Sequence, residues 1–169
     1  LILDDSIFIG DNFALIKYGF DYSDTDYSSN RHRKEDESVG QYYKATQDSR
    51  AFYIQSSLNL PNQASVLSFG LRNEKTNFSG EDTVDRNIDG FKNSWNATDH
   101  DSLSSSTTNT VINIGLEKII TGNVKAFAKY AESFRTPNID ERIKSTTSGS
   151  FALLDQESDE VEFGIRLND

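Results

Sequence analysis

Apolar and polar side chains alternate with a period of two along several stretches of this chain. In residues 13–22 one face carries apolar and aromatic side chains and the other carries charge; the first set is Ala14, Ile16, Tyr18, Phe20 and Tyr22, and the second is Lys17, Gly19 and Asp21. Side chains point alternately to opposite faces of a strand, whereas an amphipathic helix repeats every three or four residues. We therefore expect a strand with one apolar face.

The same alternation returns along the rest of the chain. Residues 1–9 read as the end of a strand, and further strands are expected at residues 48–60, 66–78, 110–120, 124–133 and 153–168. Together with residues 13–22 this makes about seven strands, and the predicted class is all-β.

The connections between these strands alternate in length. Residues 10–12, 61–64 and 121–123 are short turns, whereas residues 23–47 and 79–108 are long polar segments and residues 135–152 are of intermediate length. An antiparallel up-and-down meander with short turns at one end and long loops at the other is the layout of a large transmembrane β-barrel. Soluble up-and-down barrels do not require this regularity.

If the apolar faces meet lipid, the opposite faces line the interior of such a barrel. The expected interior set is polar and of mixed charge: Lys17, Asp21, Gln55, Ser57, Arg72, Glu74, Asn113, Glu117, Lys125, Lys129, Glu160, Glu162 and Arg166. Aromatic residues near strand ends suit a girdle at the membrane interface; these are Tyr18, Phe20, Tyr22, Phe78, Tyr130 and Phe134.

The composition of the chain excludes several classes of function. The chain has 169 residues, a formal net charge of −10 and no cysteine. An acidic chain is unsuited to nucleic acid, whose phosphates need a basic face, and the absence of cysteine excludes disulfides and thiol chemistry. No catalytic constellation stands out, so we expect no enzyme, and we expect no cofactor or metal site.

One segment of the chain carries a specific motif. The run YAESFRTPNIDERI turns polar after a strand, and its candidate residues are Phe134, Arg135, Pro137, Asn138 and Glu141. Proline disfavours a continuing strand, so a strand should end just before Pro137. The returning strand contains E-x-x-E-V-E-x-G, from Glu157 to Gly164. Together these elements resemble the C-terminal barrel region of TonB-dependent outer-membrane receptors.

The resemblance implies a function and an architecture. Residues 1–169 would be part of the receptor's β-barrel domain, a partial chain whose plug domain and remaining strands lie elsewhere. The protein would reside in the bacterial outer membrane among its lipids. It would import a scarce nutrient, by default a ferric siderophore, with energy from the TonB complex, which engages the N-terminal part of such receptors.

The motif and the loops supply the candidate site residues. For the motif a structural role is favoured over ligand contact, because Arg135 has carboxylates nearby in sequence to pair with. Ligand contact is expected from the long loops, through Arg31, His32, Arg33, Trp95 and His100. Haem receptors of this family resemble a pattern FRAP, His, NPNL; here Thr136 replaces the alanine, and no histidine follows before Leu153.

Two other interpretations concern residues 79–108. Their six carboxylates lack the D-x-D-x-D-G spacing of a calcium loop, which favours a solvated segment. The alternative function is a soluble secreted β-sandwich that binds carbohydrate or adheres to a surface through Phe91, Trp95 and Asp99. In a sandwich the apolar strand faces would pack against a second sheet about 10 Å away.

Overall fold

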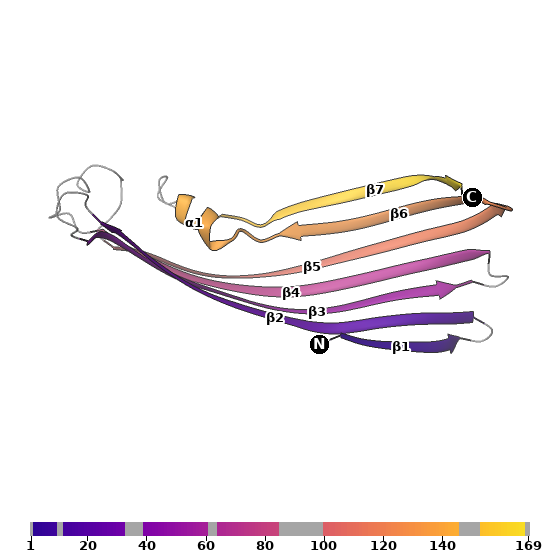
Figure 1. Cartoon of the computed structure of the whole chain (residues 1–169), viewed down its shortest axis with the longest axis horizontal. Coiled ribbons are helices and arrows are strands. Elements are labelled where there is room, and N and C mark those ends of the chain that lie inside the picture. Colours follow the sequence, from indigo (N-terminus) through magenta and orange to yellow (C-terminus); the bar gives the residue numbers. More distant parts are fainter. Residues whose placement is uncertain are drawn as a thin grey trace.

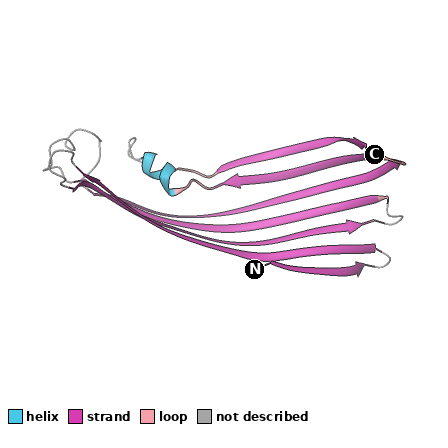
Figure 2. Ribbon diagram, viewed as in Figure 1, coloured by secondary structure: helices cyan, strands magenta, loops and turns pink. Residues whose placement is uncertain are grey.

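The computed structural model describes residues 2–9, 12–32, 39–60, 64–84, 100–145 and 153–167. Seven strands in this part of the chain form one antiparallel sheet in sequential order (Figures 1 and 2). The strands are β1 (Ile2–Ile9), β2 (Asn12–His32), β3 (Val39–Asn59), β4 (Ser65–Val84), β5 (His100–Thr121), β6 (Val124–Arg135) and β7 (Gln156–Leu167), and one short helix, α1 (Ile139–Ser145), follows β6. The predicted meander of about seven strands is confirmed.

The strand register separates the sheet into two faces. We call the face on which α1 lies the interior face, because Ile139 packs there against Tyr43, Ala45 and Phe78. Following the register from these residues puts every member of the predicted polar interior set on this same face. The opposite, exterior face carries exposed apolar side chains, among them Phe20, Phe52, Phe69, Ile114, Leu116, Val161, Phe163, Ile165 and Leu167.

The exterior face is uncovered within the described residues. Val161, Phe163 and Ile165 on β7 are 73%, 82% and 73% exposed. All described strands belong to one sheet, so the second sheet that the sandwich interpretation needs is absent from this part of the chain. An apolar face of this extent is stable against lipid rather than water.

The predicted lengths of the two longest loops are wrong. β2 continues to His32 and β3 begins at Val39, so most of residues 23–47 is strand. Likewise β4 runs to Val84 and β5 begins at His100. These extensions carry polar residues on both faces, mostly Ser, Thr, Asn and Asp in β2, β4 and β5, so the apolar contrast that reveals a strand is lacking.

Side-chain hydrogen bonds connect the strands where the polar extensions begin. The amide nitrogen of Asn77 donates to Asp48 at 3.0 Å, and the Ser106 hydroxyl donates to Oδ1 of Asn77 at 2.9 Å. This polar ladder runs across β3, β4 and β5. It adds to the backbone pairing where no apolar pattern exists.

Two further expectations are corrected by the structure. Phe78 does not belong to an exterior aromatic girdle; it lies on the interior face and is 2% exposed. Tyr18, Phe20, Tyr22 and Tyr130 have the opposite alternation and belong to the exterior set. Phe134 shares their alternation, but it lies where β6 is no longer paired with β5 and lines the space between these strands. The segment after β6 is also more than a loop, since it contains α1.

The turn between β5 and β6 is as short as predicted. Gly122 adopts a φ of 36°, in the left-handed region that residues with a Cβ adopt at a cost. A tight reversal at this point therefore uses the one residue type without that penalty. Among the described residues, no helix is long and apolar enough to span a membrane.

Candidate functional site: the interior face and the segment after β6

The motif segment folds back through a reciprocal capping box at the start of α1. The side-chain oxygen Oδ1 of Asn138 accepts a hydrogen bond from the backbone N–H of Glu141 at 2.9 Å, and Oε2 of Glu141 accepts one from the backbone N–H of Asn138 at 3.1 Å. Both donors belong to the group that a helix start leaves without intrahelical partners. Asparagine before the helix and glutamate at its third position thus start α1 here.

Arg135 ties this helix start to the end of β6. Its Nη2 donates to Oε1 of Glu141 at 2.5 Å, while Oε2 of the same carboxylate serves the cap. Pro137 is buried, and β6 ends at Arg135, before the proline, as predicted. Arg135, Asn138 and Glu141 are therefore joined by hydrogen bonds in one corner of the chain, and Pro137 lies within that corner.

A second carboxylate marks the point where β5 and β6 separate. The β5–β6 register runs from Thr121↔Val124 to Asn113↔Ala131 and goes no further. There Oε2 of Glu132 accepts the backbone N–H of Ile112 at 3.0 Å. Beyond this point Asn109 of β5 donates to Asp155, just before β7, and Phe134 lines the space between these strands.

Behind this corner, α1 covers a small apolar cluster on the interior face. Tyr43, Ala45, Phe78 and Ile139 are buried together, with Tyr27 and Leu103 packed at the edge. The rings of Tyr27 and Tyr43 meet edge to face, with centroids 5.9 Å apart. The cluster lies at the end of the sheet that bears the long connections (Figure 1).

Arg142 of α1 completes the cluster. It is 2% exposed, and its guanidinium carbon lies 4.5 Å from the centroid of the Phe78 ring. Burial lowers the pKa of Arg142, and the charges of Asp155 and Tyr43 act in the opposite direction. A buried cation needs such compensation, and the ring face of Phe78 adds a cation–π contact.

A polar cavity of about 410 Å³ opens beside the cluster on the interior face. Three of its lining side chains, Gln47, Thr76 and Thr136, have buried oxygen atoms without a hydrogen-bond partner among the described residues. Buried polar oxygens of this kind are normally satisfied by water or by a ligand. Sequence reasoning noted Thr136 only as a departure from the haem-receptor pattern, and it did not select Gln47 or Thr76, because single Gln and Thr residues give no recognisable motif.

Arg72 of β4 reaches across β3 to β2 beside this cavity. It donates to Glu74 through Nε at 3.0 Å and through Nη2 at 2.7 Å, and to Asp21 through Nη1 at 2.9 Å. Ala51 of β3, which is 2% exposed, is opposite both carboxylate residues in the register and leaves room for the arginine to cross. The network braces β2 against β4 above the small side chain.

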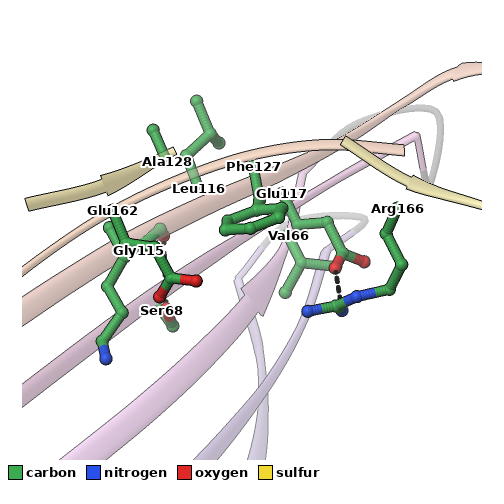
Figure 3. A pocket seen from close by; sticks show the side chains of 10 residues that line it. Val66, Ser68, Gly115, Leu116, Glu117, Phe127, Ala128, Glu162 and Arg166 are labelled. Carbon is green, nitrogen blue, oxygen red and sulfur yellow. Dashed lines mark hydrogen bonds and ion pairs between the residues drawn. The ribbon is translucent and has the colours of Figure 1, made fainter. Parts of the chain in front are cut away.

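A second network lies nearer the short turns, and its Glu117–Arg166 pair is drawn in Figure 3. Glu117 accepts from Lys125 at 2.8 Å and from Arg166 at 3.1 Å, which links β5, β6 and β7. The Arg166 guanidinium lies 5.3 Å from the ring centroid of Phe127. That ring lies close over Gly164, where an added Cβ would come within 3.0 Å of it. In Figure 3, Leu116 and Ala128 point away from these polar residues, as the alternation requires.

The loop candidates lie at one end of the sheet. Arg31 and His32 end β2 and His100 begins β5, so the backbone brings them to the same end as the α1 corner. Their side chains are not described, and Arg33 and Trp95 lie outside the described residues.

These observations identify the sheet as part of the wall of a large transmembrane β-barrel. Its exterior is apolar, and its interior is polar and crossed by ion pairs. The profile of the TonB dependent receptor-like β-barrel family matches residues 3–169, and the chain belongs to this family. Members of this family are transport receptors of the bacterial outer membrane.

Solved structures show the same fold. One is the ferric citrate transporter FecA in its unliganded form, which is similar over 99% of this chain and 24% of its own, with a TM-score of 0.66 and 15% identity. Another is the ferric-catecholate import receptor Fiu from E. coli K12 in an open form, similar over 97% of this chain and 26% of its own, with a TM-score of 0.62 and 12% identity. This chain therefore spans about a quarter of either structure, and no curated protein matches it in sequence.

Proposed function

We propose that residues 1–169 are part of the barrel domain of an outer-membrane receptor that imports a ferric siderophore by energy-coupled transport. The observation that carries the proposal is the two-faced sheet, with an apolar exterior and an ion-paired polar interior, in a chain of the TonB-dependent receptor family. A ferric chelate is proposed as cargo because both solved structures of similar fold bear names of ferric chelate transporters.

The remaining parts of the mechanism follow from this assignment. A plug domain and further strands, encoded elsewhere in the same protein, would close the barrel, and the N-terminal part would engage the TonB complex. Cargo would first meet the end of the sheet that bears the long connections. There we propose contacts from Arg31, His32, Arg33, Trp95 and His100, whose cationic and aromatic groups suit an anionic chelate.

Uptake of labelled iron tests the function. The complete receptor is expressed in a Gram-negative strain that lacks its own ferric receptors, and cells receive radioactive iron bound to citrate, to a catecholate or to a hydroxamate. We expect accumulation of one chelate, abolished by a protonophore. A receptor that is folded in the outer membrane but accumulates none of the three above the empty-vector level would contradict the proposed cargo class.

Residue variants in the same assay test the site. Arg31→Gln with Arg33→Gln should raise the KM for the transported chelate by about thirtyfold, because each removed charge–chelate contact is worth about 1 kcal/mol net. Lys118→Gln, an exposed exterior residue near the short turns, is the control. Equal KM values for all three proteins would remove these arginines from the site.

A further inference from the structure

Two cations face each other on the exterior face, where the apolar band ends. Phe20 and Phe52 are direct neighbours in the register of β2 and β3, and they are 47% and 49% exposed. Two residues further toward the long connections, the register aligns Tyr22 with Arg50 and Arg50 with Lys75. We call Arg50 and Lys75 the boundary pair.

The position of this pair relative to the membrane follows from strand length. A transmembrane strand needs about 9–11 residues to cross the hydrocarbon. β6 and β7 have 12 residues each, whereas β3 has 21 and β4 has 20. Counted from the short-turn ends of β3 and β4, at Asn59 and Ser65, the boundary pair falls where the hydrocarbon ends and lipid headgroups begin.

The positive charges of the boundary pair are not fully balanced by carboxylates of the described residues. Like charges directly opposite each other on neighbouring strands destabilise a sheet. Nε of Arg50 lies 4.0 Å from Oδ2 of Asp48, and that same oxygen accepts the Asn77 amide at 3.0 Å. The Arg50 side chain is 64% exposed, and Lys75, also exposed, forms no ion pair with a described residue.

A tyrosine holds the arginine in place. The Arg50 guanidinium carbon lies 5.8 Å from the ring centroid of Tyr22, which is itself 57% exposed. A contact with the ring face stabilises the cation without using its N–H groups as donors. Asp24 and Asp48 form the next row outward, so the bases lie nearer to the hydrocarbon than the acids do.

From this arrangement we propose that Arg50 and Lys75 bind a phosphate group on the headgroup of an outer-leaflet lipid, beside Tyr22. The negative charge of a phosphate between the two cations relieves their repulsion. The acyl chains of the same lipid would then lie against Phe20 and Phe52. Basic residues at the edge of a membrane segment bind anionic headgroups in this manner. The inference rests on the proposed function only for the outer-membrane location, and not on the cargo.

The test measures lipid retention by the complete receptor purified from outer membranes in detergent. Bisphosphorylated lipid A is added, and native mass spectrometry counts the bound lipid. Each charge removed should weaken binding about fivefold, so Arg50→Gln with Lys75→Gln weakens it by the product of two such factors. Lys44→Gln with Lys118→Gln removes the same charge from two other exposed exterior positions on β3 and β5 and should leave binding unchanged.

Three results would overturn the proposal. Equal retention by both double variants would show that the boundary pair does not bind the lipid. Equal retention of fully dephosphorylated lipid A would exclude phosphate as the recognised group. Displacement of the lipid by an equal concentration of inorganic phosphate would assign the site to free phosphate instead.

Two controls keep these results interpretable. Heat-modifiable migration in electrophoresis verifies that each variant is folded, and Lys75→Gln alone provides a milder change should the double variant fail to assemble. A receptor that takes up none of the ferric chelates still gives a readable result here, because lipid retention does not depend on cargo.

Discussion

The guanidinium of Arg142 covers the ring of Phe78 at 4.5 Å from its centroid, and this contact seats α1 on the interior face of the sheet. Both side chains are 2% exposed. Phe78 comes from β4, the central strand of the sheet, and Arg142 comes from the segment after β6. Their contact therefore joins the barrel wall to the corner built by Arg135, Asn138 and Glu141, and it makes the position of α1 testable.

Removing either partner should loosen α1. Phe78→Ala deletes a buried ring, a change that costs about 3–5 kcal/mol in well-packed cores, whereas Arg142→Ala loses a cation–π contact of about 1–2 kcal/mol. Hydrogen exchange of the backbone amides of Ile139–Ser145 should speed up in this order. Phe20→Ala, on the exterior face, is the matched control; the same exchange rates in all variants would show that α1 is held by other contacts.

The capping box predicts a graded response at residue 141. Glu141→Ala removes both the cap and the partner of Arg135 and should lower the stability of α1 by about 1–2 kcal/mol. Glu141→Gln retains a capping oxygen and loses only the ion pair. That pair is half exposed, with side chains 55% and 35% accessible, so its loss should cost well under about 1 kcal/mol. The opposite order, measured by hydrogen exchange or proteolysis at α1, would show that the ion pair dominates.

Adjacent residues of β7 test which face meets lipid. Phe163 lies on the exterior face and Glu162 on the interior face. Phe163→Arg should lower the free energy of unfolding in bilayers by about 2–4 kcal/mol, because it places a charge against hydrocarbon. Glu162→Arg should cost much less, since it remains within a polar interior. Equal costs in urea titrations would contradict the assignment of faces.

Arg72 should stabilise the sheet through the geometry of its guanidinium as well as through its charge. Arg72→Lys preserves the charge but loses the forked donors that reach Glu74 and Asp21 together. With its side chain 37% exposed, we expect a loss of about 1 kcal/mol for lysine and more for alanine, which leaves two carboxylates unpaired. Thermal unfolding of the folded receptor measures this. Full retention of stability in Arg72→Ala would mean that the network contributes nothing net.

Local alternation predicts the position of some residues and not of others. It places Lys17, Glu117 and Arg166 on the interior face, because a period of two leaves only one assignment once the apolar face is identified. The expectation for Phe78 is wrong although its alternation matches that of Arg72 and Glu74, a signal present in the chain itself. The extensions of β2–β5 are not predicted, because Ser, Thr, Asn and Asp on both faces carry no apolar contrast.

The sequence by itself determined the strand pattern, the two faces, the short turns and the family resemblance, since all of these depend on local spacing. Only the tertiary structure decided that Arg142 contacts Phe78, that the Arg72 side chain crosses over Ala51, and that Arg50 lies opposite Lys75. Each of these pairs joins residues far apart in the chain. Their proximity depends on the strand register and on the direction in which the segment after β6 returns, and neither of these is encoded in the spacing within one strand.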